Sequence, residues 1–259
     1  MNFYKSSRAL LIFIRKVLLA DFSRLMRLYY RYFWKATTGS IYEFLNDYSV
    51  KNPNLFFIQV GSNDGFQNDL LYKFILRDQW KGILIEPQPK PFKILSYIYR
   101  KKNVKLLNVA IDNKSKSRRL YKIAVSNSRW ASGLSSFDEV KIKGLINSKR
   151  VIRKSKNEGV KMPLNPETFV AFDEVKCVSF DDLIAKNTIK KIDLLQIDTE
   201  GYDFELLKQF PFETLKPNVI IFENIHLSTE DCKNAESLLE KQAYQLKDFG
   251  SDTLAKLIG

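Results

Sequence analysis

Short apolar segments that end in a glycine turn or a carboxylate recur along this sequence, and they limit its fold more than any other feature. Residues 55–60 (LFFIQV) lead into a glycine turn, and residues 82–86 (GILIE) end in Glu86 before a proline-rich turn. Residues 192–198 and 218–223 repeat the pattern, and a helical stretch follows each of them. Such short apolar runs are typical of strands buried on both faces. Strands that alternate with helices predict a parallel sheet with helices on both faces, a doubly wound α/β fold.

The segments between and after these strands complete the pattern. Apolar residues between positions 66 and 75 share one helix face, and residues 90–101 predict a second helix. Residues 104–111 predict a third strand. Residues 244–248 and 253–257 predict a hairpin that closes one edge of the sheet.

The first fifty residues differ from this α/β pattern and predict a helical extension. One helix face carries a basic residue every three to four positions, with large apolar residues beside or opposite it. The basic positions are Arg24, Arg27, Arg31 and Lys35. A basic amphipathic helix can rest on anionic lipid. It can also pack on its own domain or on a second subunit, which is the commoner use of such a helix.

Residues 112–175 interrupt the α/β pattern with a segment rich in lysine and arginine. Because the segment follows the third predicted strand, it leaves the sheet at the carboxyl edge, where ligands bind in such folds. We interpret it as a basic, substrate-facing lid, with a charged and solvated loop as the alternative. Within it, residues 130–137 (WASGLSSF) could close over the site, and Trp130 could offer a flat face to a sugar ring.

The net charge restricts the partners of the chain. A charge of +13 over 259 residues predicts an anionic partner: an acidic glycan, a phosphate-bearing substrate, a membrane surface or nucleic acid. No recognised nucleic-acid motif accompanies the charge, so nucleic acid is the least expected of these partners.

The cysteines and the first apolar run indicate a cytoplasmic setting. Cys177 and Cys232 have no CxxC spacing and no histidine-rich neighbourhood, so we expect free thiols in a reducing compartment. The run at residues 9–14 is far shorter than the roughly 20 residues that span a membrane. It also makes a poor signal peptide, because Arg15 and Lys16 follow it and no small-residue cleavage site appears.

The first glycine turn, residues 61–65 (GSNDG), differs from the dinucleotide-binding fingerprint. That fingerprint holds pyrophosphate with three glycines, whereas here Asn63 replaces the middle one. A ligand without phosphates that needs close backbone approach fits better, and S-adenosylmethionine is such a ligand. Glu86 follows Gly61 by 25 residues, close to the spacing of a carboxylate that accepts hydrogen bonds from both ribose hydroxyls. The predicted cofactor-binding residues are Gly61, Ser62, Asn63, Asp64, Gly65, Glu86, Asp198 and Glu200.

Taken together, these motifs resemble the FkbM family of methyltransferases over about residues 55–257. The segments that carry the resemblance are FIQVGSNDG (57–65), IEP (85–87), VSFDDL (178–183), IDLLQIDTEGYD (192–203) and FE (222–223). The resemblance implies a methyltransferase domain at residues 51–259 with a Rossmann-like class I sheet of about seven strands and an antiparallel C-terminal edge. It also implies bound S-adenosylmethionine and, usually, O-methylation of sugars or natural products. Many members carry an acid where this chain has Gln59.

Acidic residues at the ends of the fourth and fifth predicted strands suggest where the chemistry occurs. Asp198 and Glu223 would lie side by side, joined by Glu200 and His226. Carboxylates there would favour a sulfonium charge, and one group could take the proton as a substrate hydroxyl attacks the methyl carbon. Alignment of donor and acceptor would supply most of the rate acceleration.

We assign the catalytic roles in this cluster to three residues, His226, Asp198 and Glu223. His226 is the only histidine of the chain and the first candidate for general base. The alternative is a structural histidine that hydrogen-bonds Glu223 and fixes a loop. A divalent metal held by Asp198, Glu223 and His226 is the least favoured hypothesis, and we predict no metal.

We therefore expect a cytoplasmic methyltransferase that methylates a hydroxyl of a sugar, glycan or related small molecule, as in polysaccharide biosynthesis. The charge suggests an anionic or lipid-linked acceptor and peripheral membrane contact through residues 1–35. An NAD(P)-dependent oxidoreductase of Rossmann type is the second hypothesis, although the missing glycine counts against it. A non-catalytic module that binds membrane or nucleic acid through its basic surface is the third.

Overall fold

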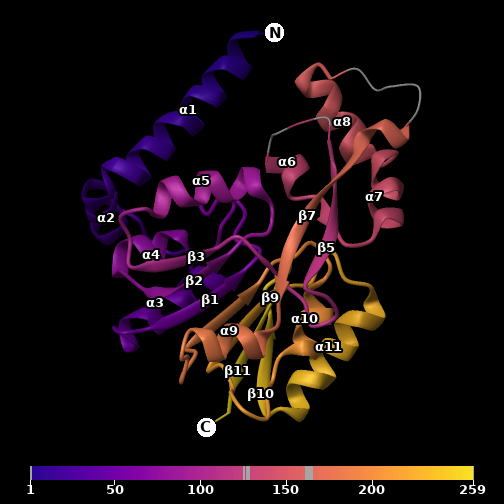
Figure 1. Cartoon of the computed structure of the whole chain (residues 1–259). Helices are drawn as coiled ribbons and strands as arrows, with labels where there is room; N and C mark the ends of the chain where they lie inside the picture. The colour runs from indigo at the N-terminus through magenta and orange to yellow at the C-terminus, as the bar shows by residue number, and fades with distance from the viewer. Residues whose placement is uncertain (1, 125, 127–128, 161–165, 259) are drawn as a thin grey trace.

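The fold is built around one mixed sheet of seven strands (Figure 1). The computed structural model describes residues 2–124, 126, 129–160 and 166–258. In spatial order, the strands are β10 (Tyr244–Asp248), β11 (Asp252–Leu257), β9 (Val219–Glu223), β8 (Leu194–Ile197), β1 (Phe56–Val60), β2 (Lys81–Ile85) and β3 (Val104–Leu107). Five of them, from β9 to β3, are parallel, while β11 is antiparallel to both β9 and β10. The predicted parallel sheet with an antiparallel C-terminal edge is confirmed.

Helices cover both faces of the sheet because successive strand residues point to opposite sides. Phe57 of β1 enters one apolar cluster, and Ile58 enters the other. The first cluster is covered by α4 (Tyr72–Asp78) and α5 (Pro89–Tyr99). The second is covered by α9 (Phe180–Lys186), α10 (Asp203–Gln209) and α11 (Thr229–Lys241). This is the doubly wound arrangement expected from the sequence.

Three helices precede the sheet: α1 (Asn2–Asp21), α2 (Ser23–Tyr32) and α3 (Ile41–Lys51). Along one side they pack on their own domain, where Leu19, Tyr30 and Leu45 are buried in the first apolar cluster. The ring of Trp34 meets Phe74 of α4 edge-on, with ring centroids 5.6 Å apart. No helix among the described residues is both long and apolar enough to cross a membrane.

The helix predicted directly after the first glycine turn begins later than expected, at Tyr72. Asn63 and Asn68 both adopt positive φ angles, 46° and 54°, which interrupt a right-handed helix. Asp69 then accepts hydrogen bonds from the backbone N–H groups of Leu71 and Tyr72, at 2.8 and 2.7 Å. The apolar residues Phe66, Leu70 and Leu71 are buried. The periodic pattern therefore predicted correctly which residues are buried, but it placed the start of the helix too early.

The described residues of the insertion form a folded subdomain. The third predicted strand is divided, since β3 ends at Leu107 and β4 (Ala110–Ile111) joins a second sheet. That sheet has the order β4, β7 (Val170–Val178), β5 (Ser117–Ile123) and β6 (Ser135–Ser136). Its helices are α6 (Arg129–Ser132), α7 (Glu139–Ile146), α8 (Lys149–Glu158) and the 3-10 helix Pro166–Phe169. Among the described residues of this subdomain, Ile123, Leu134, Ile142 and Val151 form a small core of their own.

Candidate active site

A cavity of about 630 Å³, part of it open to solvent, lies at the carboxyl ends of β1, β2 and β8. The insertion supplies part of the wall. The lining residues are Val60, Gly61, Asn63, residues 85–88, 109–111, Leu120, residues 132–133 and 135–137, 198–200, Tyr202 and Leu206.

Gly61 brings the ends of two neighbouring strands together at the base of this cavity. Its φ angle is +87°, and a Cβ atom there would lie 1.8 Å from the carbonyl oxygen of Asp198. Val60, which precedes Gly61, and Ile197, which precedes Asp198, are register partners on the neighbouring strands β1 and β8. Only glycine allows the turn after β1 to pass this close to the end of β8.

The turn after β8 is held by the buried carboxylate of Asp203. This carboxylate accepts hydrogen bonds from the backbone N–H of Thr199 at 3.2 Å and of Gly201 at 3.0 Å. Burial raises the pKa of Asp203 to about 6. The bonds allow Glu200 and Gly201 to adopt positive φ angles, 54° and 98°, and turn Glu200 toward the cavity.

Glu86 connects the ends of β1 and β2. Its carboxylate accepts hydrogen bonds from the backbone N–H of Asn63 at 2.8 Å and of Gln88 at 2.7 Å. The side chain is buried and lines the cavity. Glu86 therefore orders the glycine turn in addition to facing the space where a ligand would lie.

The structure separates the eight predicted cofactor-binding residues into two groups. Five of them line the cavity: Gly61, Asn63, Glu86, Asp198 and Glu200. The other three support the turn from behind. Asp64 accepts from the backbone N–H of Gln67 at 3.0 Å, the Ser62 hydroxyl donates to the Gln59 carbonyl at 3.3 Å, and the Gly65 carbonyl accepts from Tyr99.

Gln88 is a cavity residue that the sequence did not single out. Its amide donates to the carbonyl of Ser132 at 2.8 Å and lies 3.3 Å from the hydroxyl of Ser135. These contacts attach the lid to the start of α5. The only signal in the sequence was its position, two residues after Glu86.

Trp130 does not have the role predicted for it. Its ring NH donates to Glu158 at 2.9 Å, and its side chain packs against the core of the insertion. The cavity is instead lined by residues 132–133 and 135–137, which belong to the segment expected to close over the site. The sequence predicted that the Trp130 ring would stack on a sugar, but in the structure the ring packs against the core of the insertion.

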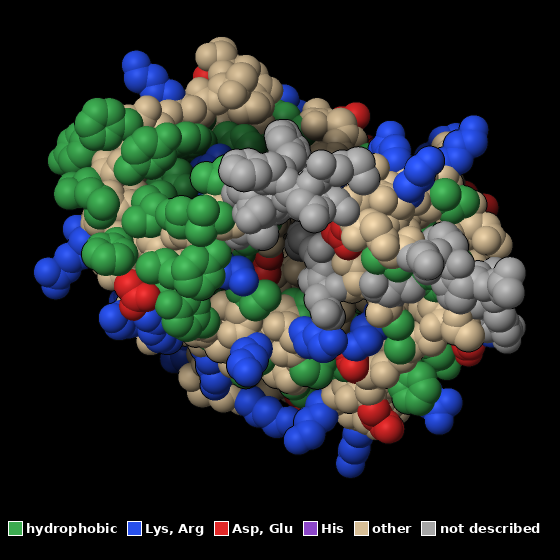
Figure 2. All heavy atoms as spheres, turned by 90° about the horizontal axis from the view of Figure 1, so that it is seen from above, with side chains coloured by type: hydrophobic (Ala, Val, Ile, Leu, Met, Phe, Trp, Pro, Cys, Tyr) green, Lys and Arg blue, Asp and Glu red, His purple; other side chains and the backbone are tan. Residues whose placement is uncertain are grey.

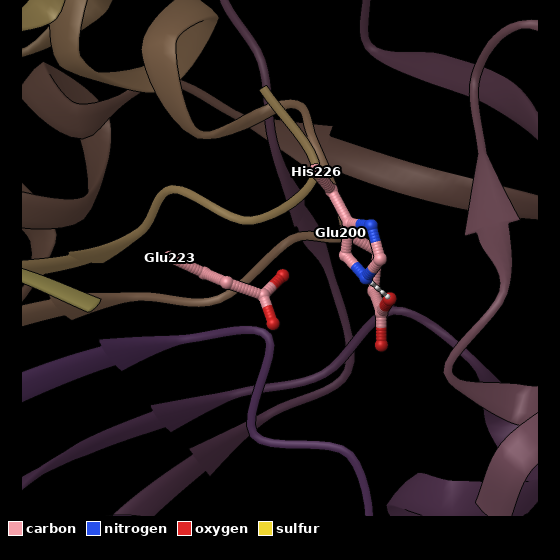
Figure 3. A group of neighbouring side chains, drawn as sticks. All are labelled: Glu200, Glu223 and His226. Carbon is pink, nitrogen blue, oxygen red and sulfur yellow. Dashed lines mark ion pairs between the residues drawn. The ribbon is translucent and has the colours of Figure 1, made fainter. Parts of the chain in front are cut away.

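Two of the three predicted catalytic residues, His226 and Glu223, lie close to Glu200, and Figure 3 shows the imidazole of His226 directed at Glu200. Nε2 of His226 lies 3.0 Å from Oε2 of Glu200. The structural alternative, in which His226 bonds Glu223, is therefore wrong about the partner. Oxygen atoms of Glu200 and Glu223 and a nitrogen of His226 all lie within 4.8 Å of one another, a spacing that could hold a metal ion. Asp198, which the metal hypothesis included, is not in this group.

Burial and the negative charges of Asp198 and Glu200 raise the pKa of Glu223 to about 9. The raised pKa favours the protonated form of Glu223, and a protonated carboxyl cannot accept the proton of a substrate hydroxyl. This favours His226 over Glu223 as the candidate base.

The charge of the cavity wall is opposite to that of the whole chain. Its lining includes Glu86, Asp198 and Glu200 but no lysine or arginine among the described residues. Such a wall disfavours a pyrophosphate and favours a cation. The cavity lining fits S-adenosylmethionine. Glu86 could accept hydrogen bonds from the ribose hydroxyls, and Asp198 and Glu200 could face the positive charges of the sulfonium and amino groups. Apolar side chains such as Ile85 could cover the adenine ring.

The sequence of residues 59–246 matches the family described as the methyltransferase FkbM domain. The chain belongs to this family. It is therefore a methyltransferase whose methyl donor is S-adenosylmethionine. The FkbM match covers both the glycine turn and the acidic turn after β8. No curated protein matches the sequence.

Solved methyltransferase structures resemble the chain at low identity. Methyltransferase FkbM from Methylobacillus flagellatus KT is 14% identical, with a TM-score of 0.46 over 79% of this chain and 44% of that one. An O-methyltransferase from Bacillus cereus in complex with SAH is 10% identical, with a TM-score of 0.41 over 92% and 90%. The O-methyltransferase TomG from Streptomyces achromogenes, in complex with SAM, is 9% identical, with a TM-score of 0.40 over 93% and 90%. They add nothing to the assignment of an acceptor.

A second cavity of about 400 Å³ adjoins the first and has a different character. The two share Ser135 and Glu200 in their walls. The second is lined by three groups that can carry positive charge, Lys141, Arg150 and His226. Nζ of Lys141 donates to the backbone carbonyl of Glu200 at 2.9 Å, which fixes the lid against the acidic turn.

Proposed function

We propose that this FkbM methyltransferase transfers the methyl group to a hydroxyl of a sugar, glycan or related small molecule that also carries an anionic group. One observation carries the proposal: the acidic cavity shares Ser135 and Glu200 with a second cavity, whose largely apolar wall also includes Lys141, Arg150 and His226. The acidic side suits the cationic donor, and the cations of the second cavity suit an anionic group of the acceptor. The boundary between them is where an acceptor oxygen and the methyl carbon would meet.

The pair formed by His226 and Glu200 supports a hydroxyl as the methylated group. An alcohol is a weak nucleophile, and removal of its proton during attack assists the reaction. Nε2 of His226 lies 3.0 Å from Oε2 of Glu200, so a neutral imidazole with its proton on Nε2 would leave Nδ1 as the atom that can accept this proton. Glu200 would then stabilise the imidazolium that forms. S-adenosylmethionine supplies a methyl carbon whose bond to sulfur breaks as the new bond to oxygen forms.

Lys141 and Arg150 support an anionic acceptor. Both belong to the lid, from α7 and α8, and both face the second cavity. A carboxylate or phosphate on the acceptor would gain charge-assisted hydrogen bonds from them. An acidic sugar in a polysaccharide precursor combines such an anion with several hydroxyls.

A comparison of two matched glycosides tests this function. Transfer of tritiated methyl groups from S-adenosylmethionine is measured with 4-nitrophenyl β-D-glucuronide and with 4-nitrophenyl β-D-glucoside. The proposal predicts a kcat/KM for the glucuronide at least about tenfold higher, because one charge-assisted hydrogen bond is worth about 1.5–3 kcal/mol. Equal transfer to both, or transfer to a 4-nitrophenyl amine in place of a hydroxyl, would contradict it. Binding of NADH with no binding of S-adenosylhomocysteine would favour the oxidoreductase hypothesis.

A further inference from the structure

The exposed hydrophobic side chains of this protein are concentrated on its first two helices. Of the 17 large hydrophobic residues exposed within the described part of the chain, ten lie between positions 10 and 33. Their exposed fractions range from 43% to 75%. We call these ten the apolar face: Leu10, Leu11, Phe13, Ile14, Phe22, Leu25, Leu28, Tyr29, Tyr32 and Phe33. Figure 2 shows hydrophobic side chains gathered on this part of the surface, on the left of the view.

The apolar face is not the side by which the helices attach to the domain. Leu19, Ala20 and Tyr30 are buried on the inner side, and Tyr30 lies edge-on to Tyr72 of α4 at 5.8 Å between ring centroids. Asp21 forms ion pairs with Arg100 and Lys101 next to α5. Both helices are thus held in place, and they present the apolar face outward.

The spacing of the exposed residues follows the helix. On α2 and the residues that flank it, Leu25, Tyr29 and Tyr32 recur at intervals of four and three and therefore form one continuous stripe. Scattered exposed apolar residues are common and need no explanation, but a contiguous patch of this kind marks a contact surface.

A fringe of positive charge borders the apolar face. Arg24, Arg31 and Lys35 are exposed beside it, and Arg27 is half-buried. Between residues 10 and 35 the sequence has one acid, Asp21, and its ion pairs are made toward α5. The positive charges of the fringe are therefore not neutralised by acids of residues 10–35 and can attract an anionic partner.

We propose that α1 and α2 form a membrane-docking face that rests on an anionic lipid surface. Helices with exposed Leu, Phe and Tyr on one side and Arg or Lys beside them lie in the plane of the interface, with the apolar side chains at the boundary between headgroups and acyl chains. Each basic residue near an anionic surface adds about 1 kcal/mol of attraction. This docking is independent of which acceptor the methyltransferase uses.

Charge decides between a lipid surface and a second copy of the chain. A two-fold pairing through the apolar face would bring Arg24 and Arg31 of one copy toward the same cations of the other, with no acid on the face to neutralise them. Anionic headgroups neutralise the same cations. The aromatic residues Tyr29, Tyr32 and Phe33 are also of the types found at the membrane interface.

Flotation of the whole chain with lipid vesicles tests the proposal. Vesicles of phosphatidylcholine alone are compared with vesicles that contain phosphatidylglycerol in equal amount. We expect the protein to float with the anionic vesicles, with binding that weakens as salt is added. Equal recovery with both kinds of vesicle, or none with either, overturns the proposal, and this comparison needs no variant.

Two pairs of variants, each with a matched control, separate charge from apolar contact. Arg24→Gln with Arg31→Gln should lower binding to anionic vesicles about 30-fold, or about fivefold for each charge. Lys233→Gln with Lys241→Gln removes the same charge from α11, at the opposite end of the molecule in Figure 1, and should change binding little.

Leu25→Ser with Phe33→Ser should abolish the binding that survives high salt. Val140→Ser with Ile258→Ser, two exposed residues elsewhere, should retain it.

The affinity for S-adenosylhomocysteine, measured by calorimetry, should be the same in all these variants, because none touches the cavities. Sedimentation velocity of the wild type and of the Leu25→Ser, Phe33→Ser variant gives the remaining outcome. A dimer that this variant dissociates, together with no vesicle binding by the wild type, would assign the apolar face to a second copy and overturn the proposal.

Discussion

The buried amide of Gln59 donates a hydrogen bond to the buried carboxylate of Asp69, with Nε2 2.7 Å from Oδ2. Asp69 in turn accepts the N–H groups of Leu71 and Tyr72 and so starts α4. Gln59 therefore has a structural role: its amide supports the carboxylate that caps the start of α4 after the glycine turn.

Replacing Gln59 by leucine should lower the free energy of unfolding at pH 7 by about 1–3 kcal/mol, because Asp69 loses a buried donor. Gln59→Glu places a second carboxyl against Asp69, whose pKa burial already raises. The folded state of this variant then holds a proton that the unfolded state releases, so its stability falls as pH rises. Urea unfolding at pH 5 and pH 8 measures both effects. A Gln59→Glu variant with the same pH dependence as wild type would contradict this role.

The carboxylate of Glu86 should contribute to cofactor affinity. Glu86→Gln keeps the size of the side chain but removes the charge, so hydrogen bonds to two ribose hydroxyls weaken by about 1.5–3 kcal/mol in total. We expect the Kd for S-adenosylhomocysteine, measured by calorimetry, to rise about 10- to 100-fold. Glu230→Gln, on the exposed first turn of α11, is the matched control and should bind as the wild type does. An unchanged Kd for Glu86→Gln would limit this residue to ordering the glycine turn.

The sequence predicted the sheet and the strand-end residues because both follow from local features. Apolar runs bounded by Gly61, Glu86 and Asp198 contain the information on strand position, and a parallel sheet brings their carboxyl ends to one edge. The lid could not be built in the same way. Its sheet pairs β5 with β7, which lie about fifty residues apart in the sequence, and the sequence of neither strand indicates that the two pair.

The individual roles at the site were harder to predict than its location. Asn63, whose φ angle is +46°, lines the cavity, whereas the next residue, Asp64, accepts a hydrogen bond from Gln67 behind the turn. Glu200, which lies beside His226, also has a positive φ angle, 54°. Neither angle leaves a signal in composition or periodicity, although Gly201 beside Glu200 indicated a tight turn.

His226 and Glu200 should act as one unit in catalysis. His226→Asn removes the group that accepts the proton, and we expect kcat to fall about 10²- to 10⁴-fold while the Kd for S-adenosylhomocysteine stays within about twofold. Glu200→Gln leaves the imidazole but removes the charge that stabilises its protonated form. We therefore expect kcat of Glu200→Gln to fall by a smaller factor, and kcat of the double variant to be no lower than that of His226→Asn, because the two residues act as one unit. A double variant whose losses multiply would indicate that Glu200 acts independently of His226.

Gln88 should control how firmly the lid closes. Gln88→Ala removes the hydrogen bonds to Ser132 and Ser135 but leaves the donors and acids that face the cofactor. We expect faster dissociation of S-adenosylhomocysteine in stopped-flow experiments and faster hydrogen exchange of backbone amides in residues 129–137. Gln67→Ala, which removes an amide bonded to Asp64 behind the glycine turn, is the control for loss of a nearby glutamine. Unchanged exchange in the lid of the Gln88 variant would show that other contacts hold it closed.

Glu223 should make the stability of the protein depend on alkaline pH. Its pKa rises from an ordinary 4.5 to about 9 in the folded state, because it is buried beside Asp198 and Glu200. Between these two values the folded state holds a proton that the unfolded state has released, so the free energy of unfolding decreases as pH rises and levels off above about 9. Glu223→Gln carries no such proton, and its unfolding free energy should fall less than that of the wild type between pH 6 and pH 9. Thermal unfolding across this range distinguishes the two proteins, and parallel curves would mean that Glu223 is ionised in the folded state at neutral pH.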